Sequence, residues 1–477
     1  MSEVHGVPYK GLIPYLEEDA AFFFGRESER EIITANLLAS RLTVLYGASG
    51  VGKTSVLRAA VARHLKELTR RNLAENGSPE FVAVVFSSWR DDPVRGLLEG
   101  VQNTIFHDLG EHFARSASFS PSLADSLCTY AQSVGGELLI ILDQFEEYFL
   151  YHPSEEGEGT FSHEFPRAVN HPNLQVNFLV SLREDALGKL DRFKGRIPGL
   201  FDNYLRLQHL DREGARAAIE KPIEQYNILQ DSLERHVRIE QKLVDTVLQQ
   251  TEVGKVAVGE IGRGVVKGEN LTGPSSAHIE TPYLQLVMTR VWEHEMHSNS
   301  RVLRLVTFQH LGGATLIAHT HLDVFMKKMG KRERKIAAAL FHYLVTPEGS
   351  KIALTAKDLA YYTKMRQPEV EKVLGRLSSP TARILHSMVT GHDQHKLQRF
   401  EIFHDVLAPA ILYWRRHFLE SQLSWSRIAD FLSGVGLSVG YSGLGMLLIV
   451  LINLTLAFVA RAFFWLENWL FNFVSAS

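Results

Sequence analysis

Short apolar runs alternate with amphipathic stretches over the first 210 residues of the chain. Runs of this length, rich in β-branched and aromatic residues, predict buried strands. The stretches between them carry apolar residues at helical spacing, so a helix is expected after most strands. This alternation predicts a parallel, doubly wound α/β sheet, which binds ligands beyond the carboxyl ends of its strands. The five expected strands are Leu42–Tyr46, Phe81–Phe86, Leu138–Leu142, Val176–Val180 and Tyr204–Leu207.

From Asp211 onward the pattern becomes mainly helical. The run Gly254–Ser276 is glycine-rich and weakly patterned, which predicts a loop or an insertion. Further on, three helical stretches precede two strand-like runs, Ile384–Val389 and Arg399–Ile402, in an order that resembles a winged helix. The expected domains are a lead-in (1–40), an α/β domain (41–210), a helical domain (211–332), a winged-helix domain (333–414), a linker (415–430) and a terminal segment (431–477).

The terminal segment has the composition of a membrane anchor. No charged residue occurs between Phe431 and Ala460, and the run LGMLLIVLINLTLAFVA (444–460) is long enough to span a bilayer, with a buried core helix as the alternative. Aromatic residues over 463–473 suggest an interfacial anchor or a second, partly inserted segment. An excess of arginine before the run places the large N-terminal part in the cytoplasm. These arginines are Arg415, Arg416 and Arg427, against Arg461 after the run.

Composition narrows the classes of function. The chain has 477 residues, a net charge of −3 and a pI near 6.7, so its overall charge does not favour binding to nucleic acid. Cys128 is the single cysteine, which excludes a disulfide framework and a cysteine-based zinc site. The first ten residues lack an apolar run, so no signal peptide is expected.

The first strand runs directly into the sequence GASGVGKT, which fits the phosphate-binding pattern G-x-x-x-x-G-K-T at every fixed position. Glycines allow a tight turn whose amides point at phosphate oxygens, and the following helix adds the positive end of its dipole. Lys53 can reach the terminal phosphates, while Thr54 offers a hydroxyl to Mg²⁺. The residues expected to hold the phosphates are Gly47, Ser49, Gly50, Val51, Gly52, Lys53, Thr54 and Ser55.

A second motif follows the third strand. The apolar run Leu138–Leu142 ends in Asp143, and a carboxylate at this strand end can hold Mg²⁺ together with Thr54, directly or through water. Gln144 and Phe145 then precede two acids, of which Glu146 is our first and Glu147 our second candidate for the base that orients water. The alternative is a structural strand that happens to end in aspartate.

Taken together, PYKGL, FFFGRE, GASGVGKTS, DQFEE and FHD resemble the novel STAND NTPases, signal-transduction ATPases related to the AAA+ and NOD-like families. The resemblance covers about residues 8–414. It implies that ATP or ADP is bound with Mg²⁺, and that a glutamate displaced from the position directly after the aspartate gives slow hydrolysis. The nucleotide contacts that it implies are Gly25 and Arg26 at adenine and ribose, Pro282 over the nucleotide, Arg183 at the γ-phosphate and His404 at the β-phosphate of ADP.

These features favour a membrane-anchored switch that ADP locks and ATP opens for self-assembly into a homo-oligomer. A bacterial inner membrane, and signalling or antiviral defence, is the context that the resemblance implies, with a separate sensor protein as a further partner. One alternative is a DNA-associated regulator that reads DNA through its winged helix, although nucleic acid is not expected from the overall charge. The other is a nucleotide-binding membrane scaffold without significant turnover.

Overall fold

The computed structural model describes residues 7–421, apart from 111–112, 114–121, 231, 253–277, 347–350, 380–381, 383, 391–396 and 404–406. Residues up to Trp414 form one compact unit, and Arg415–Ser477 form a second. Of the second unit, residues 415–421 are described, and they are helical. The first unit contains three groups of elements, called here the sheet lobe (27–206), the helical lobe (212–327) and the terminal lobe (331–414).

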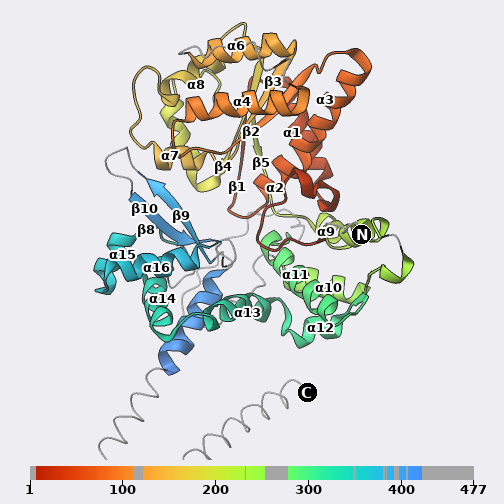
Figure 1. Ribbon diagram of the computed structural model, residues 1–477, viewed down its shortest axis with the longest axis vertical. Helices are drawn as coiled ribbons and strands as arrows, with labels where there is room; N and C mark the ends of the chain where they lie inside the picture. The colour runs from red at the N-terminus through yellow and green to blue at the C-terminus, as the bar shows by residue number, and fades with distance from the viewer. Residues whose placement is uncertain are drawn as a thin grey trace, which may run out of the picture. The chain divides into compact units, whose positions relative to one another are not determined.

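The sheet lobe is built on five parallel strands in the order β2-β3-β4-β1-β5, which confirms the expected sheet (Figure 1). Most positions of the three central strands are buried, because helices cover both faces of a parallel sheet. Neighbouring strands are held in register by pairs such as Val44 with Val180. The strands are β1 (Leu42–Gly47), β2 (Phe81–Phe86), β3 (Glu137–Leu142), β4 (Val176–Arg183) and β5 (Tyr204–Arg206).

Helices flank this sheet (Figure 1), and two layers of apolar side chains hold them against it. One layer joins α1 (Glu27–Ala39) and the helical turns that follow α2 (Lys53–Ser55) to residues such as Leu45 and Ile141. The opposite layer joins the remaining helices to residues such as Ile140. These helices are α4 (Pro93–Leu109), α6 (Leu123–Val134), α7 (Glu146–Tyr151), α8 (Phe161–Asn170) and the 3₁₀ segment η3 (Glu184–Phe193).

The helix after β1 continues far beyond its first turn. It passes from α2 into a π-helical stretch, η2 (Val56–Ala62), and then into α3 (Arg63–Asn76). Gly77, with φ of +69°, ends it in the left-handed conformation that glycine adopts without strain. The loop before α2 is thereby attached to a long, well-packed helix.

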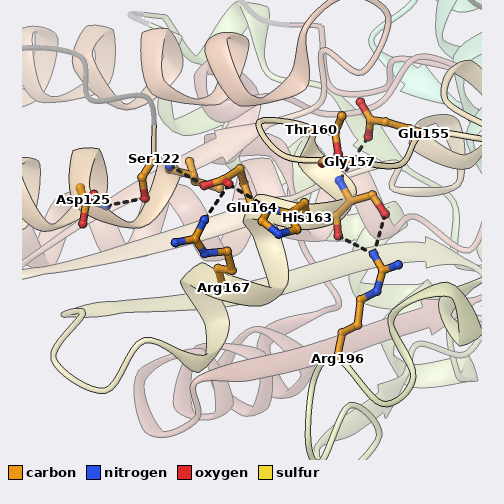
Figure 2. Close-up of polar contacts among 11 residues, drawn as sticks. Ser122, Asp125, Glu155, Gly157, Thr160, His163, Glu164, Arg167 and Arg196 are labelled. Atoms are coloured by element: carbon orange, nitrogen blue, oxygen red, sulfur yellow. Dashed lines mark hydrogen bonds and ion pairs between the residues drawn. The ribbon is translucent and has the colours of Figure 1, made fainter.

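Glu164 supports the far side of this lobe. Its side chain is buried, and one carboxylate oxygen accepts a hydrogen bond from the backbone N–H of Leu123, at the start of α6. Figure 2 shows Glu164 between the Ser122 end of α6 and Arg167, which contributes an ion pair at 3.4 Å. An acid at a helix N-terminus satisfies free amides, so the buried charge stabilises the contact between α6 and α8.

The helical lobe has a separate core of apolar side chains, which also includes Tyr9 from the N-terminal segment. Tyr9 donates a hydrogen bond to the carbonyl of Ile219, so the N-terminal segment is held against this lobe. The short 3₁₀ turn η1 (Glu17–Phe22) lies between this segment and α1. The lobe consists of α9 (Arg212–Ile228), η4 (Leu233–Arg235), β6 (Arg238–Ile239), α10 (Gln241–Gln250), α11 (Thr281–His297), β7 (Val302–Leu303), α12 (Leu305–His310) and α13 (Gly313–Lys327).

The terminal lobe combines helices with a three-stranded sheet in the order β8-β10-β9, whose strands pair antiparallel (Figure 1). Thr355 caps α15 through its hydroxyl, which accepts from the backbone N–H of Asp358. The elements are α14 (Lys331–Leu344), β8 (Leu354–Thr355), α15 (Ala356–Thr363), α16 (Gln367–Leu377), β9 (Leu385–Thr390) and β10 (Leu397–Ile402).

Several sequence-based expectations fall outside the described residues: His404, the Gly254–Ser276 run and the terminal segment 431–477. Among the described helices, none is both long and apolar enough to cross a bilayer. Membrane anchoring therefore remains a prediction from the sequence.

Candidate functional site

A cavity of about 260 Å³ lies where β1, β3 and β4 end. Its walls come from the N-terminal segment, the loop after β1, the start of α11 and Phe403 after β10. All three lobes therefore contribute to one cavity. The residues predicted from the sequence that line it are Arg26, Ser49, Gly50, Val51, Gly52, Lys53, Thr54, Ser55, Asp143, Glu146, Arg183 and Pro282.

The loop after β1 has the shape that its glycines allow. Gly50 and Gly52 have φ of +80° and +97°, a region that other residues rarely adopt. Gly47 does not line the cavity, but its carbonyl accepts a hydrogen bond from Lys53 Nζ at 2.8 Å, and the carbonyl of Ala48 accepts another at 3.0 Å. The Lys53 ammonium is thus held over its own loop, where phosphate oxygens would meet it. Burial lowers the pKa of Lys53, although the Glu146 carboxylate opposes this effect.

The surroundings of Asp143 show whether the cavity could hold a magnesium ion. The residue is 1% exposed, and its Oδ2 is buried with no donor at ordinary hydrogen-bond distance among the described residues, although the Thr54 and Ser181 hydroxyls lie close enough to oppose the rise of its pKa. Burial raises the pKa of Asp143, so a nearby cation would stabilise its charged form. Thr54 also lines the cavity, and Mg²⁺ is commonly held by one or two protein groups together with phosphates and water. Asp143 and Thr54 therefore fit the ion that the family resemblance implies.

Trp89, which the sequence analysis missed, fixes the backbone of Asp143. Its indole N–H donates to the Asp143 carbonyl at 2.7 Å, and its ring lies 5.0 Å from the Phe145 ring in an edge-on arrangement. Both side chains are almost fully buried, so the phenylalanine of DQFEE anchors the motif to the core. Gln144, between the two anchors, has φ of +54° and lines the cavity.

The two candidate bases lie in different places. Glu146 lines the cavity, and its Oε2 accepts a hydrogen bond from the Arg183 backbone N–H at 3.2 Å. Burial raises the pKa of Glu146 to about 7, while the Lys53 ammonium opposes the rise. Glu147 does not line the cavity, and its Oε1 lies 3.8 Å from Nε2 of His386 on β9. Of the two acids, only Glu146 is positioned to act on a ligand in the cavity.

Arg183 connects the sheet lobe to the terminal lobe. Its guanidinium makes two hydrogen bonds to Asp185, at 3.0 and 2.8 Å, and a third to Glu401 of β10, at 3.4 Å. Glu401 is 8% exposed and also accepts from Lys351 Nζ at 2.8 Å. The arginine expected to contact the γ-phosphate is thus also an interlobe contact.

Gly25 and Arg26, which precede α1, support the loop after β1. The Arg26 guanidinium donates to the carbonyls of Val51 (3.0 Å) and Gln208 (2.8 Å), so a direct contact with a nucleotide would compete with these bonds. Gly25 does not line the cavity; it has φ of +85°, and a Cβ atom there would lie 2.1 Å from the carbonyl oxygen of Gly214. Both residues hold the loop against the start of the helical lobe.

The cavity also has walls that the sequence analysis did not assign. They include aromatic and aliphatic side chains of the N-terminal segment and polar side chains of α11. The only sequence signal for the α11 residues was their position beside Pro282, at the start of an expected helix. The unassigned residues include Tyr15, Leu210, Ala218, Thr281 and Gln285, beside Phe22 and Phe23 of the aromatic run before Gly25.

Comparisons with known proteins give one family. A family model described as Novel STAND NTPase 1 matches residues 8–420. Solved structures with a similar fold include a Walker-type ATPase of Pyrococcus abyssi, with 15% identity, 85% of this chain and 99% of that chain covered, and a TM-score of 0.40. The ORC2 protein of Aeropyrum pernix follows, with 12% identity, 84% and 95% coverage and a TM-score of 0.40. A comparison with curated proteins gave no match.

Proposed function

Since the chain belongs to the novel STAND NTPase 1 family, we propose that its nucleotide site works as a switch. ATP binding by a P-loop NTPase follows from membership of this family. In the proposed switch, bound ADP keeps the three lobes of the first unit together. Exchange for ATP adds a γ-phosphate beside Arg183, separates the terminal lobe and exposes surfaces for self-assembly.

The observation that carries this proposal is the shared position of Arg183. The same guanidinium lines the cavity and contacts Glu401 of the terminal lobe. A γ-phosphate that attracts the guanidinium competes with Glu401, so the nucleotide state changes the strength of an interlobe contact. His404, which we expect at the β-phosphate of ADP, follows β10 and would give the terminal lobe a second link to the nucleotide.

Hydrolysis supports the return to the resting state in this proposal. Glu146 is the proposed base because it lines the cavity, whereas Glu147 points to His386. A pKa near 7 lets this carboxyl take up and release a proton at neutral pH, as a general base must. The scaffold alternative predicts equal inactivity of the wild type and Glu146→Gln while both still bind ATP. A measurable rate that only the wild type shows would reject the scaffold.

We also propose that residues 431–477 anchor the protein in a membrane, with the nucleotide site in the cytoplasm. The support is the uncharged stretch from Phe431 to Ala460 and the arginines that precede it. Flotation of the full chain with liposomes tests this anchor. Leu451→Arg should reduce flotation; equal flotation of both proteins would contradict the proposal. A bacterial signalling or defence role rests on the family resemblance alone.

A DNA-reading terminal lobe has less support. Its helix α16 carries Lys372 and Arg376, but both lie beside Glu333, at 3.6 Å for Lys372. Arg332 is likewise paired with Glu369. Basic residues that are already neutralised contribute little to phosphate binding. We therefore retain the winged helix as a proposal for the shape of this lobe, without a nucleic-acid partner.

Two measurements test the switch: the mass of the protein assembly in solution and the identity of the nucleotide bound to purified protein. Protein purified without added nucleotide should release ADP, and its mass by light scattering should increase with ATP but not with ADP. Lys53→Ala should abolish the increase, whereas the matched substitution of exposed Lys189 by alanine should not. An unchanged mass in every nucleotide state, with ATP bound, would reject the switch while leaving nucleotide binding intact.

A further inference from the structure

His386 on β9 lies at the contact between the terminal lobe and the sheet lobe. Its Nε2 is 3.8 Å from Oε1 of Glu147, which lies in the first turn of α7. This distance is too long for a hydrogen bond, so a neutral imidazole gains little from the carboxylate. A protonated imidazole carries a full positive charge and attracts the carboxylate across this distance. The strength of the contact therefore depends on whether His386 carries a proton.

The His386 ring is open to solvent, which lets it gain and lose a proton freely. Its side chain is 41% exposed, so little desolvation opposes the charged form. Histidine is the side chain that ordinarily changes its charge between about pH 5 and pH 8. Because the Glu147 carboxylate favours the charged ring, the contact is strong at the acid end of this range and is lost as pH rises through it.

The charged groups of α7 and β4 leave Glu147 available for His386. Among the described residues, no other cation lies within ion-pair distance of Glu147. Its neighbour Glu146 lines the cavity and accepts from the Arg183 backbone N–H. The Arg183 guanidinium is itself held by other carboxylates. Glu147 is thus the acid on this side of the contact that responds to a charge on His386.

The neighbouring strand β10 adds an acidic and a basic side chain to the sheet face that carries His386. Glu401 lies directly opposite His386 in the antiparallel pairing, so both side chains are on the same face. Glu401 already accepts from Lys351 at 2.8 Å and from Arg183 at 3.4 Å. Arg399, two residues before Glu401, shares this face and is exposed, so solvent screens its repulsion. These charges largely offset one another, so the carboxylate on α7 decides the effect of the proton.

Phe403 connects this contact to the nucleotide cavity. Its ring lies edge-on to the His386 ring, with 6.1 Å between the ring centres, and Phe403 also lines the cavity. Its backbone N–H donates to the carbonyl of Ile384 at 2.8 Å, two residues before His386. His386 and Phe403 therefore move with the same strand pair. Withdrawal of Phe403 from the cavity requires that His386 also leaves Glu147.

We propose that the contact between His386 and Glu147, called here the latch, makes the switch sensitive to pH: a charged His386 holds the terminal lobe against the sheet lobe. This inference rests on the proposed function, because it takes separation of the terminal lobe as the step that ATP drives. A γ-phosphate that draws Arg183 away from Glu401 leaves the latch as the remaining ionic contact between these two lobes among the described residues. Mildly acidic conditions therefore oppose separation when ATP is bound, and neutral to alkaline conditions release it.

The test measures limited proteolysis between the lobes in the full chain without nucleotide. A partly exposed ion pair changes an equilibrium by about two- to fivefold, so the effect is sought in lobe separation and not in the unfolding of the whole chain. Wild type and variant are compared at the same pH. This comparison cancels the pH dependence of the protease and that of Glu146, whose pKa is raised to about 7 in every protein tested.

Four variants give distinct expectations. His386→Gln should be cleaved about two- to fivefold faster than the wild type near pH 6, and at the same rate near pH 8. His386→Lys keeps its charge and should be cleaved more slowly than the wild type near pH 8. Glu147→Gln should match His386→Gln, and it gives the answer if His386→Gln does not fold. The matched control His342→Gln, at an exposed histidine of α14, should follow the wild type at both pH values.

One set of results overturns the inference alone: a cleavage ratio of His386→Gln to wild type that is the same near pH 6 and pH 8. A ratio near pH 6 that survives about 1 M salt also overturns it, because screening should remove an ionic effect. Light scattering tests the proposed function separately. Near pH 6 the wild type should need about two- to fivefold more ATP than His386→Gln for half of its gain in mass. A mass that bound ATP changes at neither pH overturns the proposed switch, and with it the regulation by the latch.

Discussion

Glu146 offers the most direct check of the site, because its charge should make the folded protein less stable. Burial raises the pKa of this carboxyl from 4.5 to about 7 in the folded chain. A folded state that binds its proton more tightly than the unfolded state loses stability as pH rises. The contribution of Glu146 is therefore complete below pH 4.5 and declines as pH rises through about 7. Substitution by glutamine removes the carboxylate and this decline with it.

The size of the effect follows from the same shift. Each unit of pKa corresponds to about 1.4 kcal/mol, so the ionised carboxylate lowers the free energy of unfolding by about 3 kcal/mol above pH 8. The substitution Glu146→Gln also removes a charged partner of Lys53, and burial already lowers the pKa of Lys53. Part of the stability that the substitution gains is therefore lost. We expect Glu146→Gln to gain about 2 kcal/mol over the wild type between pH 5 and pH 8.

The assay is urea denaturation of nucleotide-free protein at pH 5 and pH 8, followed by circular dichroism. Glu147→Gln is the matched control, because it makes the same change at a neighbouring acid outside the cavity. The glutamine at 146 should also retain ATP without hydrolysing it. If the difference between Glu146→Gln and the wild type is the same at both pH values, the carboxylate is not buried as described, and its assignment as the base loses its support.

Three further substitutions test the supports of the cavity. Gly25→Ala should lower the free energy of unfolding by about 2–4 kcal/mol, because φ is +85° and the new Cβ meets the Gly214 carbonyl. The control is Gly77→Ala, which has φ of +69° but open space for the Cβ. It should lower the free energy of unfolding by about 1 kcal/mol in the same denaturation assay. Arg26→Ala removes two bonds to loop carbonyls and should weaken ATP binding in calorimetry by about tenfold; unchanged affinity would show that the loop keeps its shape without it. Glu401→Gln should increase proteolysis between the lobes and the ATP-dependent gain in mass; protection equal to the wild type would contradict the interlobe role.

The strands could be predicted because a parallel sheet covered on both faces produces plain apolar runs. All five expected strands form, but β4 continues three residues beyond its expected end at Val180. Ser181 and Arg183 extend it because they pair with Leu45 and Gly47 of β1. Hydrophobicity alone does not reveal such an extension, since two of its three residues are polar and its partner strand lies elsewhere in the sequence.

The same limit applied to DQFEE. Spacing could not decide between Glu146 and Glu147, because neighbouring residues on a helix point about 100° apart and the phase was unknown. The phase is set by Gln144, whose positive φ turns the chain, and by Phe145, which is fully buried next to Trp89. Trp89 lies 54 residues before Asp143, to which it donates its hydrogen bond. No local sequence pattern could therefore predict this contact.

The contacts of Arg183 indicate which interaction a γ-phosphate would displace. Asp185, two residues away, holds the guanidinium with two hydrogen bonds of 3.0 and 2.8 Å, a bidentate arrangement that is the stronger kind. Glu401 holds it with one bond of 3.4 Å, and Lys351 can keep Glu401 satisfied after separation. A phosphate would therefore replace the interlobe bond before the local one. Loss of the weaker contact leaves no buried charge unpaired, which is the condition for a contact that opens at low cost.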